Sequence, residues 1–167
     1  MDHSPQRSHA PQLSADHPHL RVRRATEQDL PVLIAMLHDD VLGETREQHD
    51  DAAYRRGFAA VDADPGQFLA VVVDPQDTVL GMMQLSLIPG ISRGGRLRLN
   101  VEGVRISSAN RGQGLGSAMM SWAIGFGRDH GAGLVQLTTD ARRLDAHRFY
   151  TRLGFVPSHV GMKLQLD

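Results

Sequence analysis

The chain contains no cysteine, and this absence excludes several kinds of site at once. Without a thiol there is no disulfide, no thiolate metal site and no cysteine nucleophile. Long apolar runs are also missing, since no stretch approaches the roughly 20 residues that a membrane-spanning helix needs. Charge of neither sign dominates, because 18 Lys and Arg stand against 19 Asp and Glu, for a formal net charge of −1. The charge balance therefore predicts neither nucleic acid nor a membrane as a partner.

What is present is the composition of one globular domain. The 167 residues are 41% hydrophobic and 22% charged, values that suit a single domain with its own core. Residues 1–18 carry three prolines and three of the nine histidines but almost no large apolar side chains. We expect them to form a flexible tail before a folded domain over residues 19–167. No signal peptide is recognisable in the polar N-terminal residues, so we expect a cytoplasmic protein.

The first half of the domain is predicted to contain one strand and then two helices. Residues 20–25 alternate as a short strand does, and Thr26 stands three residues before Asp29, which is the spacing of a capping box. A polar connector separates the two expected helices. Their apolar residues are Leu30, Leu33, Ile34 and Leu37 in the first, and Tyr54, Phe58 and Val61 in the second.

Three strands linked by short connections are expected next, at residues 68–73, 78–88 and 96–106, and we predict an antiparallel meander. The third strand has an irregular pattern. Its apolar residues occupy odd positions at Leu97, Leu99 and Val101, then even positions at Val104 and Ile106. An extra residue explains such a change of phase, so we predict a β-bulge near Glu102 and Gly103. A strand with two buried faces after Gly103 is the alternative.

The last third is predicted to alternate between helices and strands. A glycine-rich turn leads into a helix that begins near Leu115, a strand follows at 134–139, and a final helix ends before Gly154. Two closing strands are expected at 155–156 and 162–166. The predicted order, β-α-α-β-β-β-α-β-α-β-β, requires a mixed sheet and an α/β fold.

The glycine-rich turn between the bulged strand and the following helix is the most specific segment. Glycines allow a tight turn and a close approach to a ligand, and the free N–H groups at a helix start attract phosphate. A P-loop is excluded because no Gly-Lys-Ser/Thr follows. The dinucleotide fingerprint is excluded because Ser117 stands at its third glycine and no Rossmann half precedes it. What remains is Arg-x-x-Gly-x-Gly from Arg111 to Gly116.

This segment resembles the pyrophosphate-binding signature of the GNAT-type N-acetyltransferases, and a second segment agrees with it. Residues 146–155 resemble the family's helix ending in Tyr-x-x-Leu-Gly-Phe, here from Tyr150 to Phe155. Residues 20–30 also resemble a common opening of the family. The resemblance covers residues 20–167. It implies a three-layer fold, with about four helices flanking a mixed sheet of six or seven strands whose fourth strand is bulged.

The resemblance also implies acetyl-CoA as co-substrate, with no metal. The pantetheine arm would pair with the backbone of Val104 and Ile106, and an N–H near Ile106 would face the thioester oxygen. Asparagine often stands seven residues before the tyrosine in this family, whereas this chain has Arg143. Its charge is expected either to reach the cofactor's phosphates or to stay solvated at the start of the last helix. The expected cofactor-binding residues are Val104, Ile106, Arg111, Gly112, Gln113, Gly114, Leu115, Gly116, Ser117 and Arg143.

Two residues are candidates for proton transfer. Tyr150 matches the family's tyrosine that protonates the departing thiolate; the alternative is a purely structural core residue. Glu102 is expected to take the amine proton, because it lies at the bulge. Its side chain is on the face opposite Leu97, Leu99 and Val101, and that face should line the acceptor cleft. The alternative is a glutamate paired with a neighbouring arginine on the sheet. His147, His159 and Glu44 are reserve candidates for the base.

The acceptor is expected to be a small-molecule amine, with amino-acid-like amines and peptides included. Residues 43–49, 89–95 and 157–162 should bound its site, with Glu44 and His159 as substrate-binding candidates. Two alternatives stay open, a non-catalytic acetyl-CoA-binding module and an acyltransferase for longer acyl groups. A homodimer is possible, although no residue pattern indicates its interface.

Overall fold

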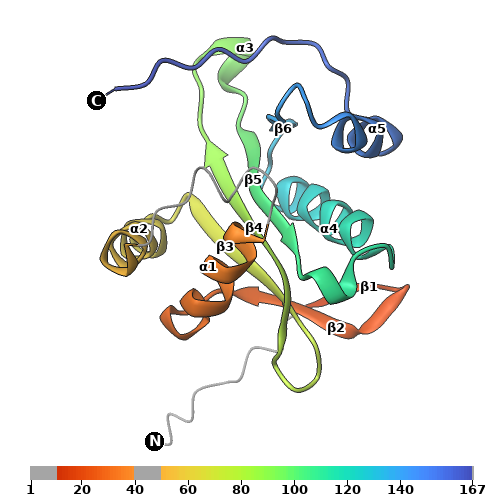
Figure 1. Ribbon diagram of the computed structural model, residues 1–167. Helices are drawn as coiled ribbons and strands as arrows, with labels where there is room; N and C mark the ends of the chain where they lie inside the picture. The colour runs from red at the N-terminus through yellow and green to blue at the C-terminus, as the bar shows by residue number, and fades with distance from the viewer. Residues whose placement is uncertain (1–10, 40–49, 167) are drawn as a thin grey trace, which may run out of the picture.

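The computed structural model describes residues 11–39 and 50–166, which fold around a six-stranded mixed sheet (Figure 1). Neighbouring strands are antiparallel from β1 to β5, and β5 pairs in parallel with β6. The strands lie in the order of the chain: β1 (Gln12–Ser14), β2 (His17–Arg24), β3 (Gln67–Val73), β4 (Val79–Ile88), β5 (Arg98–Ile106) and β6 (Leu134–Leu137). The expected mixed sheet and antiparallel meander are confirmed.

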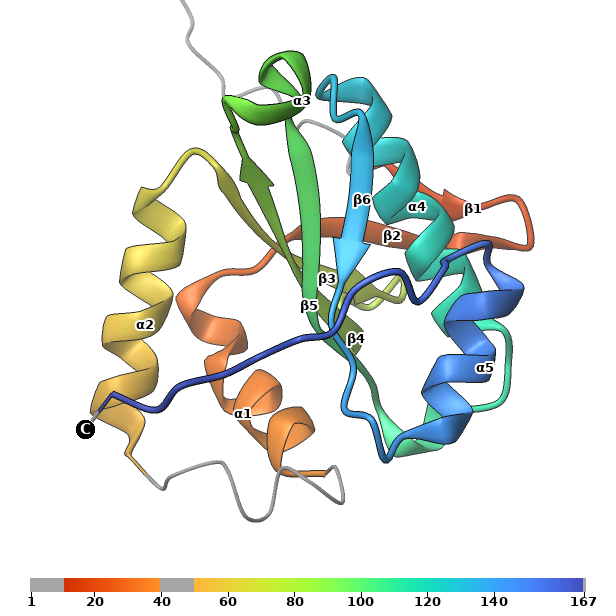
Figure 2. The ribbon, with the colours of Figure 1, turned by 90° about the horizontal axis from the view of Figure 1, so that it is seen from above.

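Helices cover both faces of this sheet, as Figure 2 shows. One face packs against α1 (Leu30–His38) and α2 (Asp51–Ala63), and the other packs against α4 (Leu115–Asp129) and α5 (Leu144–Arg152). The central strand β3 is apolar on both faces because both are covered: Val71 and Val73 belong to the core under α1, and Ala70 and Val72 to the core under α4. The three-layer arrangement follows from this two-sided burial.

The predicted start of the first helix is confirmed. Thr26 and Asp29 form a capping box around a 3₁₀ turn at Glu27–Asp29, and the Asp29 carboxylate accepts from the Thr26 N–H at 2.7 Å. Asp29 is buried and also accepts two hydrogen bonds from the Arg23 guanidinium at 2.7 and 2.9 Å. This ion pair ties β2 to the beginning of α1 and lowers the pKa of Asp29, chiefly through the hydrogen bond from Arg23.

The end of the expected N-terminal tail is structured. Residues 12–14 and 17–18, placed in the tail by the sequence, are strand residues of a β1–β2 hairpin in which Ser14 pairs with His17. The hairpin is anchored by Leu13, which is buried in the same cluster as Leu20. Because β1 precedes the other strands, the bulged strand is the fifth of the sheet and not the fourth. The remaining residues of the expected tail, 1–10, lie outside the described residues.

The two closing strands expected at 155–156 and 162–166 are wrong for this structure. The sheet ends at β6, and the described residues after α5 contain no strand. Phe155 still packs against the core, whereas the residues that follow run exposed from α5 across the molecule toward the side of α2 (Figures 1 and 2). A strand needs a partner edge, and this run makes contact with none.

Two smaller features complete the fold. The connection between β4 and β5, expected as a loop, contains the short helix α3 (Ser92–Gly95), in which Arg93 and Gly94 have left-handed backbone angles. Among residues 11–39 and 50–166, no helix is long and apolar enough to cross a bilayer.

Candidate active site

The predicted bulge lies in β5 at the expected place. Gln84 of β4 pairs with Glu102, but Met82 pairs with Arg105, so between these pairs the single residue Met83 of β4 is opposed by two residues of β5. Gly103 takes a positive φ of 59°, which glycine adopts without strain. The bulge is confirmed, and it explains the phase change: Leu99 and Val101 before it, and Val104 and Ile106 after it, pack on the same core.

Beyond the bulge, β5 separates from its parallel neighbour. The pairing between β5 and β6 runs only from Arg98–Leu134 to Val101–Leu137, although β5 continues to Ile106. Ser107 donates its N–H to the Leu80 carbonyl of β4 at 2.9 Å. Since successive N–H groups of a strand point to opposite sides, the Ile106 N–H points away from β4, toward the side that β6 has left. An extended ligand can therefore pair with this edge.

Two backbone carbonyls on this part of β5 already accept hydrogen bonds from arginine side chains. The Val104 carbonyl accepts a hydrogen bond from the Arg105 guanidinium at 2.9 Å, and the Ile106 carbonyl accepts one from Arg111 Nε at 3.3 Å. A ligand that pairs through these carbonyls must displace the two side chains. The Ile106 N–H is not engaged in either contact.

The glycine-rich turn leads from β5 into α4. After a 3₁₀ turn at Ser108–Asn110, Gly112 and Gly114 both have φ of 78°, and Gly114 is the N-cap of α4. The first-turn N–H groups of a helix, here those of Leu115 to Ser117, have no partners within the helix. Backbone groups and a helix dipole thus converge on one place, where a pyrophosphate fits chemically.

Gly116 fixes how closely this turn approaches its neighbours. A Cβ built at Gly116 would lie 3.2 Å from Ile106 Cδ1 and 3.5 Å from the Phe149 ring. The turn, the end of β5 and α5 therefore meet in direct contact. Three sequence-predicted elements are brought together at this point, although the sequence places them up to some forty residues apart.

Arg111 makes a different contact from the expected one. Its guanidinium donates to the Asp39 carboxylate at 2.7 Å and to the Asp39 carbonyl at 2.9 Å. Asp39 is the C-cap of α1. The pair is half exposed, so the Arg111 side chain holds the end of α1 beside the glycine-rich turn instead of pointing at the turn itself.

Tyr150 lies in α5 on the side that faces the core. Its ring makes edge contacts with Phe149 and Phe155, with centroid distances of 5.0 and 5.8 Å. Burial raises the pKa of the Tyr150 phenol above its ordinary value, while the positive charges of Arg143 and Arg105 act in the opposite direction. The phenol therefore carries its proton at neutral pH, which is the state required of a proton donor.

Glu102 is exposed on the other face of the sheet, at the edge of a row of polar side chains that the sequence analysis missed. Ser86 and Gln84 of β4 both donate to Gln67 Oε1, at 2.7 and 2.9 Å. Next to them on the same face lie Asn100, Gln136 and Arg98, where Gln136 Nε2 donates to Asn100 Oδ1 and Arg98 donates to Gln136 Oε1, both at 3.4 Å. The polar residues at alternate positions 98, 100 and 102 were the signal for this row.

The other sequence candidates are placed as follows. His147 Nε2 lies 3.0 Å from the Asp140 carbonyl, which only accepts, so this nitrogen carries a proton and cannot act as a base while the contact is kept. Arg143 is the N-cap of α5. His159 is exposed and lies beside Ser158, with 2.8 Å between Oγ and Nδ1. Glu44, with the rest of the connector at residues 43–49, lies outside the described residues.

A small hollow of about 120 Å³ beside the glycine-rich turn is lined by two histidines that the sequence did not place at the site. His17 and His19 of β2 line it together with Gln113 and Leu115. His17 Nε2 lies 3.9 Å from a Cβ built at Gly114. His17, which the sequence placed in the tail, thus lies next to the predicted phosphate-binding turn.

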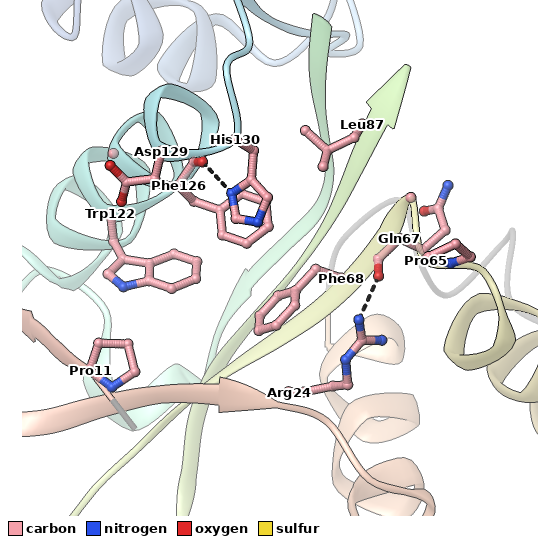
Figure 3. A pocket seen from close by; sticks show the side chains of 12 residues that line it. Pro11, Arg24, Pro65, Gln67, Phe68, Leu87, Trp122, Phe126, Asp129 and His130 are labelled. Atoms are coloured by element: carbon pink, nitrogen blue, oxygen red, sulfur yellow. Dashed lines mark hydrogen bonds between the residues drawn. The ribbon is translucent and has the colours of Figure 1, made fainter. Parts of the chain in front are cut away.

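A larger cavity, of about 520 Å³, lies elsewhere. It is lined by aromatic side chains of β3 and the C-terminal half of α4, including Phe68, Trp122 and Phe126 (Figure 3). Arg24 lies at its border and donates to the Gln67 carbonyl at 2.8 Å. None of the predicted site residues lines this cavity, so its size is no guide to the chemistry. Among the described residues, no group of three or more possible metal ligands is found.

Comparisons with known proteins identify the family that the sequence resembles. A model of the Acetyltransferase (GNAT) family matches residues 34–155. The aminoalkylphosphonate N-acetyltransferase of Salmonella typhimurium is 31% identical over 142 residues, which are 85% of this chain and 88% of that protein. The glucosamine 6-phosphate N-acetyltransferase of Trypanosoma brucei brucei is 32% identical over 92 residues, 55% of this chain and 60% of that protein.

Solved structures show the same relationship. A transcriptional regulator from Bacillus halodurans C-125 is 42% identical and superposes with a TM-score of 0.84, covering 89% of this chain and 100% of that one. The chain belongs to the GNAT family of acetyltransferases. It is an acyltransferase, and the family's co-substrate is acetyl-CoA. The resemblance and the fold expected from the sequence are both confirmed.

Proposed function

We propose that this chain transfers the acetyl group of acetyl-CoA to the primary amine of a small molecule by direct attack in a ternary complex. The observation that carries the proposal is the separation of β5 from β6 beyond the bulge, with the Ile106 N–H directed to the separated side. That edge suits an extended pantetheine arm, and the turn at Gly112–Ser117 suits its pyrophosphate. Acetyl-CoA supplies the activated acyl carbon when it is bound.

The two proton transfers are assigned to Glu102 and Tyr150. Glu102 takes the proton that the attacking amine must lose, directly or through water, and it lies on the polar face of β5. The Ile106 N–H stabilises the negative charge that develops on the carbonyl oxygen. As the carbon–sulfur bond breaks and the amide forms, Tyr150 gives its phenolic proton to the sulfur. Its raised pKa keeps that proton available through the neutral range.

The acceptor is proposed to be a small amine that also carries an anionic group, of which amino-acid-like amines are one kind. Two relatives are named for acceptors of this description, an aminoalkylphosphonate and glucosamine 6-phosphate. On the polar face of β5, Arg98 supplies a positive charge and Glu102 a negative one, with Asn100 between them. A face of this kind is complementary to a molecule with charges of both signs.

Thiol release from acetyl-CoA over a panel of acceptors tests the proposal. The panel should contain aminoalkylphosphonates, amino sugars with and without phosphate, amino acids, polyamines and short peptides. Small amines with an anionic group should give the highest kcat/KM. Turnover only with peptides or polyamines contradicts the acceptor assignment, and CoA binding without turnover on any acceptor contradicts the reaction.

Tyr150→Phe tests the acid in the same assay. We expect kcat to fall about 10²- to 10⁴-fold while CoA affinity, measured by calorimetry, stays within about twofold. The chain has two tyrosines, so Tyr54→Phe in α2 is a matched control and should keep the wild-type rate. An unchanged kcat in Tyr150→Phe would show that the phenol is only a core residue. Because burial raises the pKa of Tyr150, the wild-type rate should not fall through loss of this proton until above pH 10.

A further inference from the structure

The small hollow beside the glycine-rich turn lies where the first residues of β2 meet the start of α4. The pairing of β2 with β3 begins at Arg21, whereas β1 also pairs further back, with Ser14 opposite His17. The β1–β2 hairpin therefore extends the strand toward the turn, and it lies beside α4 in Figures 1 and 2. As a result His17 and His19, which stand in this extension, line the hollow.

The two imidazoles are the polar side chains of the hollow that make no hydrogen bond to any described residue. The other two polar side chains, Asn110 and Gln113, donate to oxygens within residues 107–109, at 2.7 and 3.2 Å. An imidazole carries one N–H group when neutral and two when protonated. His17 and His19 can therefore donate hydrogen bonds to a ligand in the hollow.

The charges around the hollow favour an anion. Its remaining lining side chains are leucines, so among the described residues no carboxylate lines it. His17 Nε2 lies 3.9 Å from a Cβ built at Gly114, the N-cap of α4, where the helix dipole and the first-turn N–H groups add positive charge. An acidic group, Asp74, lies near His19: the pKa of Asp74 is lowered chiefly by the hydrogen bond from the Thr78 backbone, and the charge of His19 contributes. His19 thus has a carboxylate in its neighbourhood, whereas His17 faces the turn.

The arginine of the turn does not supply a side chain here. Arg111 donates to the Asp39 carboxylate at 2.7 Å, beside the end of α1, and it does not line the hollow. Side-chain donors for an anion on this side of the turn therefore come from β2.

We propose that this hollow binds a phosphate group of the cofactor, and that His17 and His19 add two side-chain ligands to the backbone N–H groups of the glycine-rich turn. CoA carries phosphate in two places, a diphosphate in its chain and a monophosphate on its ribose. The hollow of about 120 Å³ is several times larger than the roughly 30 Å³ of one water molecule, so one phosphate group fits. This binding role rests on the acetyl-CoA binding of the proposed function, and it is independent of the acceptor and of the two proton transfers.

Calorimetric titration with CoA tests the role of His17 through its charge. His17→Glu should weaken CoA binding more than about 10-fold, because a carboxylate repels the phosphate, and His17→Ala should weaken it about 3- to 10-fold. His17→Arg should bind CoA at least as tightly as the wild type, because it keeps N–H donors and adds a permanent charge. A histidine with a merely structural role would give the same loss in all three variants, or no loss, and either result overturns the proposal.

The second ligand and the control use the same titration. His19→Glu should also weaken CoA binding, and an unchanged affinity would overturn its role as a ligand. His130→Glu places the same charge at the exposed C-terminal end of α4, so it should bind CoA as the wild type does. Circular dichroism should show all the variants folded.

Titration with 3′-dephospho-CoA identifies which phosphate the hollow holds. If it holds the ribose phosphate, wild type and His17→Glu should bind 3′-dephospho-CoA equally; if it holds the diphosphate, His17→Glu should lose the same affinity for both cofactors. These titrations contain no acceptor. Wild-type CoA binding that none of the substitutions changes would therefore overturn the histidine site and leave the proposed reaction standing, whereas CoA binding without turnover would contradict the reaction and leave the histidine site standing.

Discussion

Replacing Gly103 with alanine measures the energetic cost of the positive φ that the β5 bulge requires at this position. A Cβ at this position would meet no heavy atom within 4 Å, so crowding adds nothing to the effect. What remains is the left-handed backbone at φ 59°, which costs a residue with a Cβ about 1–2 kcal/mol. The unfolded chain is also less flexible with alanine than with glycine at this position, which offsets about 0.4–1 kcal/mol of that cost. The net expectation is a loss of about 1 kcal/mol in the free energy of unfolding.

The chain should accept this strain and keep the bulge. Removing the bulge would shift the strand by one residue and turn Val104 and Ile106 out of the core, since successive side chains point to opposite faces. Both residues pack against the core under α4. Losing that burial would exceed about 1 kcal/mol for the pair even though both are only half buried. CoA affinity should therefore change little in Gly103→Ala.

Urea unfolding monitored by circular dichroism measures the expected loss, which corresponds to about 2–4 °C in Tm for a chain of this size. Gly57→Ala is the matched control, because Gly57 lies within α2 and a Cβ there also meets nothing within 4 Å. That change should raise the free energy of unfolding by about 0.5–1 kcal/mol. Gly103→Asn should be milder than Gly103→Ala, since asparagine tolerates the left-handed region. If Gly103→Ala stabilised the protein as the control does, the assignment of strain to the bulge would be refuted.

Two further perturbations follow from contacts described above. Asp29→Asn should lower the free energy of unfolding by about 2 kcal/mol at pH 7, because Arg23 loses a buried charged partner but keeps Asp77. The pKa of Asp29 is depressed in the folded protein, so its contribution is present above the unfolded pKa of about 3.9 and is lost as the pH falls through the lower folded value. Thermal melts of the two proteins should therefore converge as the pH falls from 4 toward 2, and a constant difference down to pH 2 would contradict the ion pair. Gly116→Ala should raise the Kd for CoA several-fold, because the new Cβ would lie 3.2 Å from Ile106 Cδ1 and push the glycine-rich turn away from it. Gly125→Ala is the control in the same helix, where a Cβ meets nothing within 4 Å, and it should bind CoA as the wild type does. If calorimetry found the same CoA affinity in the two variants, the turn would tolerate the added methyl group.

Local features of the sequence predicted the parts of the site that depend on local geometry. The change of phase around Gly103 indicated the bulge because the period of a strand is fixed at two. The spacing of Thr26 and Asp29 indicated the helix start because a capping box spans three residues. In both cases the physical cause lies within a few positions of the signal.

Features that depend on pairing over a long distance were not predictable in this way. Residues 12–18 look like a tail because they hold few apolar side chains, yet Leu13 docks on the core together with Leu20 and Val22 of the same hairpin. The alternation at residues 160–166 does favour a strand, but a pattern in one segment does not show whether an edge of the sheet is in place to pair with it. The partnership of Arg111 with Asp39, 72 positions away, is invisible to any reading of the glycine-rich turn by itself.

Because Arg111 is already paired with Asp39, an anion that binds at the turn and recruits Arg111 must replace the Asp39 carboxylate. The arginine already has a carboxylate, and a half-exposed pair of this kind contributes about 0–1 kcal/mol. A phosphate group that recruits Arg111 therefore competes with Asp39, and only the difference between the two anions counts toward affinity. The same competition connects the glycine-rich turn with the end of α1, because a phosphate that recruited Arg111 would release Asp39 from its ion pair.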